Sequence, residues 1–445
     1  MSATHQDVRE HAQRISGGLS PDEIARRLAP KHHDGPPRVP GSGQPNAATV
    51  EKRWALLPHA AAARAALADA AALADHERFA HNIENYIGTV KLPVGLAGPL
   101  RVNGIAAQGD YYVPLATTEA ALVASYHRGA TVISLAGGCT TLILSEGVSR
   151  APAFAFKTLH EVGTFVVWCL ENLAALRAAA EATTRFGRVR DVRFTVEGNH
   201  VYVLVDYTTG DAAGQNMVTI ATQAICDYIG AHCPIRPEYF FVEGNMSGDK
   251  KASAQSFLGV RGKKVSAEVR LPRKMVERHL HTTPEKMTEY WRISAMGGVM
   301  SGTIGVQGHY ANGLAALFIA CGQDAACVSE AAVGITRFEI DATSDSLYAA
   351  VTLPNLIVGT VGGGTNLPSQ RAGLEILGLA GAGHSRALAE VCAGLALAGE
   401  ISIIAALSAH HFAQAHARLA RGKKSDNAGE AGAAPLSSAP ASSPT

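Results

Sequence analysis

Glu119, Lys250 and Asp324 are charged residues that stand next to apolar or glycine-containing segments. Glu119 ends PLATTE (114–119) and opens an apolar helix, Lys250 lies in DKK (249–251), and Asp324 follows the apolar run 314–321. A carboxylic acid can deliver a proton, and a fixed ammonium group can stabilise an oxyanion. Taken alone, Glu119 is typical of a helix cap and DKK of a solvated turn. Asp324 is less easily explained, because an acid at the end of a buried run needs a partner.

Histidine and glycine clusters are weaker candidates for a site. His410, His411 and His416 have a spacing that does not place three ligands on one helix face, so no metal site is expected. The run VGGGTN (361–366) could cradle a ligand, although a tight turn is the favoured interpretation. The chain has no G-x-G-x-x-G loop after a strand, and the lysines at 263 and 264 lack the Walker spacing.

The elements that must position these residues include one segment with a clear rhythm. Two alternating apolar runs joined by EGN (197–199) predict a β-hairpin, and longer leucine-spaced stretches predict helices. The resulting order β-α-β-β-α-β is the ferredoxin-like motif. We therefore predict an α+β protein with a compact domain here, its strands at 153–156, 192–196, 201–205 and 239–242 and its helices at 160–182 and 216–229.

The remaining segments are helical or lack periodicity. Residues 50–85 are alanine-rich and predict helices, whereas residues 32–48 read as a Pro/Gly linker. A long helix is predicted over 385–421, apolar nearly all round and therefore buried. The tail 425–445 has the Ala/Ser/Pro/Gly composition of a disordered segment.

Composition bounds the class of protein. The 445 residues carry 39 Lys and Arg against 38 Asp and Glu, with 47% hydrophobic and 17% charged residues, which excludes a disordered chain and argues against a nucleic-acid binder. Seven scattered cysteines without a C-x-x-C pair suggest reduced thiols in a cytoplasmic protein. The first sixteen residues are polar, so no signal peptide is expected, and Glu390 and Glu400 interrupt the most apolar stretch, so no membrane span is expected.

Seven motifs in order give these candidates a common context. They are ENYIG (84–88), PVGLAGP (93–99), PLATTE (114–119), GDAAGQNM (210–217), DKK (249–251), ACGQDAA (320–326) and GTVGGGTNL (359–367). Together with AGE (398–400) and the histidines up to 416, they resemble the catalytic domain of the 3-hydroxy-3-methylglutaryl-CoA (HMG-CoA) reductase family over roughly residues 80–421. The DKK and GGGTNL blocks resemble its class I branch.

The resemblance implies an NADPH-dependent oxidoreductase that reduces HMG-CoA, an acyl-CoA thioester, to mevalonate in two hydride steps. It implies a large acyl-CoA-binding domain (49–152 and 243–421, with a helical part 49–85), an inserted ferredoxin-like NADP-binding domain (153–242), a flexible N-terminal region (1–48) and a disordered tail (422–445). Neither a metal nor a nucleic-acid or membrane partner is implied. The family's active sites form between subunits, so a dimer or tetramer is expected, and this would also explain the low charged fraction.

Four residues occupy the family's catalytic positions. Lys250 would stabilise the oxyanion that hydride attack creates, and His416 would protonate the departing CoA thiolate. Glu119 would give the proton of the second reduction, so its pKa is expected to be raised by burial and by a neighbouring carboxylate. Asp324 would be that neighbour and would bridge Glu119 and Lys250.

Other positions match the family's binding residues. The loop before the helix at 216 would hold the dinucleotide phosphates at a helix N-terminus, and Arg185 would contact the 2′-phosphate, which favours NADPH. The matched cofactor positions are Arg185, Asp211, Gly214, Asn216, Met217 and Arg421. The matched substrate positions are Ser125, His127, Glu243, Asp249, Lys251 and Asn312.

Three departures from the family pattern cluster in the acyl pocket. Ala155 and Ile293 stand where the family has cations, and Glu243 stands where it has serine. We hypothesise a changed acyl pocket that accepts a thioester without a distal carboxylate, on CoA or a carrier protein. The alternative is that Lys157, Arg292 or Lys251 binds the carboxylate instead. A non-catalytic sensor of CoA or NADP is a further alternative, disfavoured because all four catalytic positions are kept.

Overall fold

The computed structural model describes residues 4–6, 9–10, 17–31, 38–41, 46–259 and 261–409, and the chain divides into two compact units, Met1–Val90 and Lys91–Thr445. In the first unit, short helices surround Val50, Trp54 and Tyr86, and Arg53 donates a hydrogen bond to the Tyr86 carbonyl (2.9 Å). The predicted helical part is therefore a set of short helices: α3 (Ala47–Trp54), α4 (Ala61–Leu67), α5 (Ala70–Ala74) and the 3-10 helix His76–Phe79, preceded by α2 (Pro21–Leu28).

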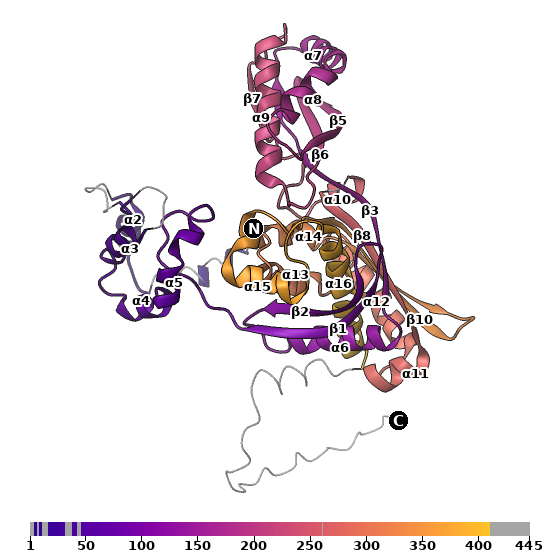
Figure 1. The fold of residues 1–445 in the computed structure, drawn as a ribbon. Helices are drawn as coiled ribbons and strands as arrows, with labels where there is room; N and C mark the ends of the chain where they lie inside the picture. Colours follow the sequence, from indigo (N-terminus) through magenta and orange to yellow (C-terminus); the bar gives the residue numbers. More distant parts are fainter. Residues whose placement is uncertain are drawn as a thin grey trace, which may run out of the picture. The chain divides into compact units, whose positions relative to one another are not determined.

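The second unit is built on one sheet whose strand β3 (Cys139–Arg150) is shared by two halves. β3 pairs with β8 (Gly262–Pro272) in one half and with β6 (His200–Thr208) in the other (Figure 1). The strand order is β7-β4-β6-β3-β8-β10-β9, with β1 also on β3, β2 on β1 and β5 on β6. The large half uses β1 (Val94–Asn103), β2 (Gln108–Ala116), β8, β9 (Ile335–Asp341) and β10 (Ser346–Leu356).

The segment 153–241 forms the predicted βαββαβ arrangement. Strands run in the order β7-β4-β6-β5, all antiparallel, and Val201, Val203 and Val205 of β6 are buried against the helices because alternate residues face one side of a sheet. The expected helix 160–182 is two helices, since the chain bends by 68° at Asn172. The elements are β4 (Ala153–Ala155), α7 (Leu159–Glu171), α8 (Leu173–Glu181), β5 (Arg188–Glu197), β6, α9 (Gln215–His232) and β7 (Tyr239–Phe241).

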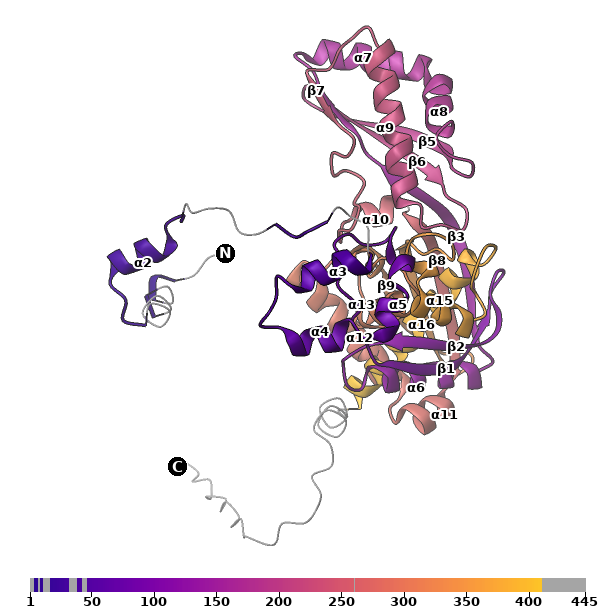
Figure 2. The ribbon, with the colours of Figure 1, turned by 60° about the vertical axis from the view of Figure 1, so that its left-hand side comes forward.

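Helix α16 (Ser385–Ser408) forms the centre of the large half. It packs against α6 (Leu122–Leu135), β8 and β10 and is buried nearly all round (Figure 2). The crossing with α6 is close, because a Cβ added to Gly129 would lie 1.9 Å from the Ala398 carbonyl oxygen. Alone among the helices of the described residues, α16 has the length and hydropathy of a membrane span, but 89% of that window is buried in the protein, as in a core helix.

Two buried acids of α16 hold loops of the large half in place. Glu390 accepts hydrogen bonds from the N–H groups of residues 105–107, which form the turn between β1 and β2. Glu400 accepts from the N–H groups of Gly308 (3.0 Å) and His309 (2.6 Å) and from the Thr336 hydroxyl (2.7 Å). These two acids interrupt the apolar stretch in the sequence because they bind the backbone of neighbouring loops. The rest of the helix predicted to reach residue 421 lies outside the described residues from 410 onward.

Candidate active site

Lys250 and Asp324 form the centre of the candidate site. The Lys250 Nζ lies 2.8 Å from an Asp324 carboxylate oxygen, and both side chains are partly exposed, at 41% and 43%. Asp324 follows α13 (Tyr310–Ala320) and caps the 3-10 helix Ala325–Cys327 by accepting from the Ala326 N–H (2.9 Å). The hydrogen bond that Lys250 donates to Asp324 raises the pKa of Lys250, so the ammonium group stays charged beside an open surface.

The backbone of Lys250 is held in a left-handed conformation, with φ +56°. Its N–H donates to Glu330 (3.1 Å), and its carbonyl accepts from the Ser329 hydroxyl (2.7 Å). Both partners belong to the short helix α14 (Val328–Ala331), which follows the 3-10 helix that Asp324 caps. A non-glycine residue at positive φ persists only where its surroundings fix it, so α14 determines the direction of the lysine side chain.

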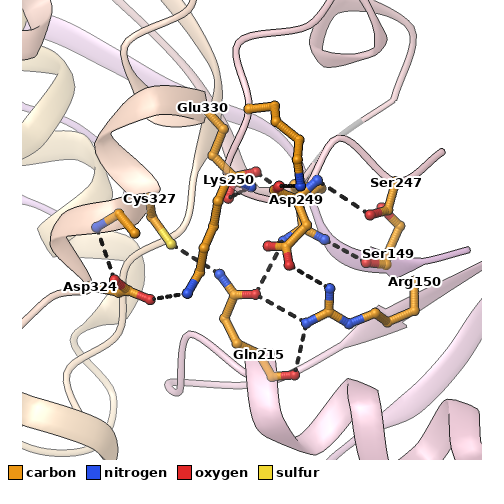
Figure 3. Close-up of polar contacts among 12 residues, drawn as sticks. Ser149, Arg150, Gln215, Ser247, Asp249, Lys250, Asp324, Cys327 and Glu330 are labelled. Carbon is orange, nitrogen blue, oxygen red and sulfur yellow. Dashed lines mark hydrogen bonds and ion pairs between the residues drawn. The ribbon is translucent and has the colours of Figure 1, made fainter. Parts of the chain in front are cut away.

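A chain of buried charges connects Lys250 to the inserted segment. Arg261 donates to Glu330 through Nε (2.8 Å) and to Asp249 through Nη2 (2.6 Å), and Arg150 donates to the other Asp249 oxygen (2.6 Å) (Figure 3). Burial alone would raise the pKa of Asp249, but the hydrogen bond from Arg150 and the charge of Arg261 outweigh it and lower the pKa. Burial raises the pKa of Glu330 against the opposing charge of Arg261. Each carboxylate oxygen of Asp249 is thus bonded to an arginine.

Glu243 also belongs to this network. Its carboxylate accepts from the Asn245 N–H (2.7 Å), the Ser247 hydroxyl (3.0 Å) and the Ala151 N–H (3.3 Å), and it lies 3.5 Å from Arg150. The other two departures from the family pattern lie elsewhere. Ala155 is buried in β4, and Ile293 is 74% exposed on α12 (Pro284–Ser301).

Glu119 lies apart from this cluster. It is exposed after β2, and its N–H donates to the Thr117 hydroxyl (3.0 Å). Within the described part of the chain, no hydrogen bond or ion pair joins it to Asp324 or Lys250, so the bridge expected from the resemblance stays a prediction. His416 and Arg421 lie outside the described residues.

The predicted dinucleotide loop leads into α9. Gly214 is the N-cap of α9 with φ +80°, and a Cβ there would lie 2.2 Å from Thr209 Cγ2. No side chain caps this helix, so the N–H groups of its first turn are available for phosphate oxygens. The exposed Asn216 lies in this turn, and the Met217 sulfur accepts from the Thr184 hydroxyl (3.1 Å), which fixes the loop before the exposed Arg185. Gly214, Asn216, Met217 and Arg185 therefore fit a dinucleotide.

Asp211, expected in cofactor binding, has an architectural role in the structure. Its carboxylate accepts from the N–H groups of Gly383 (2.8 Å) and Ser385 (3.2 Å) at the start of α16. Burial acts to raise its pKa, but these backbone hydrogen bonds outweigh it and lower the pKa. The dinucleotide loop is thus fastened to the helix that leads to the histidine-bearing segment.

The remaining predicted substrate residues are dispersed. Asn312 contacts His309 (3.0 Å), whose ring stacks on Tyr126 at 4.7 Å between centroids. The Ser125 hydroxyl donates to Ser402 (3.0 Å), His127 is exposed, and Lys251 donates to the Asp249 carbonyl (2.7 Å).

Sequence reasoning missed the supporting residues Glu330, Gln215 and Cys327 as well as the role of Arg261. Arg261 stands in a basic stretch with Lys263 and Lys264, which gives some signal, but nothing in the sequence pairs it with Glu330. No group of three or more potential metal ligands occurs among the described residues.

Comparisons with known proteins place this geometry in a family. The family model described as hydroxymethylglutaryl-coenzyme A reductase matches residues 49–421. The 3-hydroxy-3-methylglutaryl-coenzyme A reductase of Pyrococcus horikoshii is 44% identical over 354 residues, covering 78% of this chain and 85% of the relative. The reductase of Haloferax volcanii is 45% identical over 345 residues, covering 76% and 85%.

A solved structure agrees in fold. The NADPH-bound class II 3-hydroxy-3-methylglutaryl-CoA reductase of Streptococcus pneumoniae superposes with a TM-score of 0.61 at 19% identity, covering 91% of this chain and 97% of that one. With the sequence matches, this confirms the α+β fold and the resemblance found in the motifs. The chain belongs to the hydroxymethylglutaryl-coenzyme A reductase family.

Proposed function

We propose that this chain reduces HMG-CoA to mevalonate and free CoA with two NADPH. The observation that carries the proposal is the Lys250–Asp324 pair at 2.8 Å, held at an accessible position in a chain of this family. NADPH, held at the N-terminal end of α9, would supply the two hydrides. Gly214, Asn216, Met217 and Arg185 would hold it. Arg421, which the resemblance also assigns to the cofactor, would contribute as well.

Lys250 stabilises the oxyanion formed when the first hydride adds to the thioester carbon. Its charge is secured by Asp324, which raises the pKa of the ammonium group. The C–S bond of this adduct then breaks, and the CoA thiolate takes a proton, which His416 supplies in this proposal. The second hydride adds to the aldehyde carbon, and the alkoxide takes a proton from Glu119. Two hydrides and two protons thus convert the thioester into the alcohol and a free thiol.

The domain roles follow from the same reasoning. Residues 153–242 would carry the dinucleotide, and residues 49–152 with 243–421 would carry the acyl-CoA through Ser125, His127, Lys251 and Asn312. Asp249 and Glu243 would shape this site through the two arginines that bind them.

A second candidate substrate is an acyl-CoA without a distal carboxylate. The guanidinium of Arg150 already contacts Asp249 (2.6 Å), Glu243 (3.5 Å) and the Thr219 hydroxyl (3.0 Å), so it offers little to a substrate carboxylate. NADPH oxidation should be compared between HMG-CoA and 3-hydroxybutyryl-CoA. A higher kcat/KM for HMG-CoA supports the first candidate, and a higher value for 3-hydroxybutyryl-CoA supports the second.

Assembly and location complete the proposal. Ile293, Met296, Val299 and Met300 of α12 are 74%, 59%, 68% and 83% exposed, an apolar surface that a second copy in a homo-oligomer would cover. All seven cysteines are buried and unpaired, which suits the reducing cytoplasm. Light scattering of the purified protein measures the assembly.

A further inference from the structure

Gln215 connects the inserted segment to the residues around Lys250. It is the first residue of α9, directly after Gly214, yet its side chain contacts the large half of the unit (Figure 3). The side-chain oxygen accepts from Arg261 Nη2 (3.2 Å), and the side-chain nitrogen donates to the Cys327 sulfur (3.0 Å). This carboxamide therefore joins the N-terminal end of α9 to the segments that carry Arg261 and Cys327.

The side-chain oxygen of Gln215 also accepts from Arg150 Nη2 at the longer distance of 3.5 Å, but its two shorter contacts, with Arg261 and Cys327, belong to the support of the catalytic pair. Cys327 ends the 3-10 helix that Asp324 caps, and its N–H donates to the Asp324 carbonyl (3.0 Å). Arg261 binds Glu330, which in turn accepts the N–H of Lys250. A displacement of α9 would therefore shift Asp324 through Cys327, and Lys250 through Arg261 and Glu330.

The chemistry of the three groups fixes the orientation of the amide. A guanidinium can only donate, so the oxygen of Gln215 must face Arg261 and the amide nitrogen is left for the sulfur. Burial raises the pKa of the Cys327 thiol to about 12, which keeps the sulfur a neutral thiol. The bridge thus has one orientation.

We propose that Gln215 is a positioning residue that sets α9, and with it the dinucleotide site, against the Lys250–Asp324 pair. This inference rests on the proposed function for its kinetic consequence. The side chain acts through Arg261 and Cys327, so its loss should lower the rate of reduction and leave the affinity for NADPH nearly unchanged.

Gln215→Leu tests this proposal, with Gln223→Leu as the matched control. Gln223 lies on the same helix but is exposed and bonds Asp227 four residues on (2.8 Å). Arg261 keeps Glu330, Asp249 and the Ser149 carbonyl in Gln215→Leu, so no buried charge loses all its partners and the fold should persist. We expect kcat to fall roughly 10-fold with KM for NADPH within about 2-fold, and Gln223→Leu to match the wild type.

Two further measurements separate positioning from general stability. Hydrogen exchange of the unliganded protein should increase in peptides covering 247–252 and 325–331 in Gln215→Leu only, although the substitution is in α9. Cys327→Ala should lower kcat in the wild type and have little further effect in Gln215→Leu, because the two residues share one contact.

The exchange measurement needs no turnover, so it decides the inference even if the wild type fails to reduce HMG-CoA. Unchanged exchange in both large-half peptides would overturn the proposal. So would a loss confined to KM for NADPH, or a Gln223→Leu variant that behaves like Gln215→Leu.

Discussion

The buried carboxylate of Glu330 accepts a hydrogen bond from the backbone N–H of Lys250 at 3.1 Å, and the same carboxylate binds Arg261 at 2.8 Å. One acid thus fixes the left-handed backbone of the lysine and anchors the charge network that reaches the inserted segment. The geometry at the lysine therefore depends on a residue that needs no contact with substrate.

Replacing Glu330 should damage both stability and activity. Glu330→Gln removes one charge from a pair whose side chains are 0% and 3% exposed, which leaves Arg261 partly uncompensated and should lower the free energy of unfolding by about 3 kcal/mol. Urea unfolding measures this change. Glu375→Gln, in an exposed pair with Arg371, is the control and should cost less than about 0.5 kcal/mol. Equal losses in the two variants would refute the structural role of Glu330.

Glu400 should make stability depend on pH. Burial raises its pKa from 4.5 to about 7 in the folded protein. A carboxyl whose folded pKa is raised contributes stability that is full below pH 4.5 and is lost as the pH rises through about 7. Wild type should therefore lose up to about 3 kcal/mol between pH 4.5 and 8 relative to Glu400→Gln, as measured by denaturant unfolding at each pH. Parallel pH profiles of the two proteins would contradict this prediction.

Gly214→Ala should weaken NADPH binding. An alanine at 214 would have to adopt a positive φ, and its Cβ would lie 2.2 Å from Thr209 Cγ2, so the N-terminal end of α9 must shift. Gly210→Ala separates the two effects, because Gly210 also has positive φ (+62°) but nothing within 4 Å of the added Cβ. Titration by NADPH fluorescence should show at least about 10-fold weaker binding for Gly214→Ala than for Gly210→Ala. Similar dissociation constants would argue against phosphate binding at this helix end.

Asp211 should act through α16 and not through direct contact with the cofactor. Asp211→Ala removes the acceptor of two N–H groups and should destabilise the protein by about 1–2 kcal/mol, with NADPH affinity changed less than about 3-fold. Thermal unfolding and NADPH titration measure the two effects, and Asp227→Ala, on the exposed surface of α9, is the control. A large loss of NADPH affinity without destabilisation would restore the direct binding role.

The sequence predicted local structure well and long-range pairing poorly. The alternating runs around EGN (197–199) were sufficient to predict the hairpin β5–β6, because strand periodicity and turn residues are local signals. The break at Asn172 is not predicted, since the apolar spacing continues across it, although the Asn172 side chain donates to the Trp168 carbonyl at the end of α7 (2.8 Å). Ala155 and Ile293 show a similar limit of the sequence. Their family positions place them with Glu243 in one acyl pocket, whereas within one chain Ala155 lies in β4 and Ile293 on α12.

The same difference between local and long-range signals applies to the candidate site. The roles of Lys250 and Asp324 were suggested by motifs, and the structure brings the two residues together. Glu330 and Cys327 lie outside the seven motifs, and Gln215 lies inside GDAAGQNM without a role of its own there. Their importance arises from contacts between residues 46 to 112 positions apart, such as Gln215–Arg261, Lys250–Glu330 and Gln215–Cys327. Local patterns do not encode such contacts.

The most direct test of the account is the stoichiometry and lysine dependence of HMG-CoA reduction. Wild-type protein should oxidise two NADPH for each mevalonate formed, and Lys250→Met should lower kcat by at least about 100-fold while keeping its fold and NADPH affinity. Lys286→Met, an exposed lysine of α12, is the matched control and should retain wild-type rates. Folded wild type that leaves HMG-CoA unreduced, or a Lys250→Met variant as active as Lys286→Met, would contradict the account.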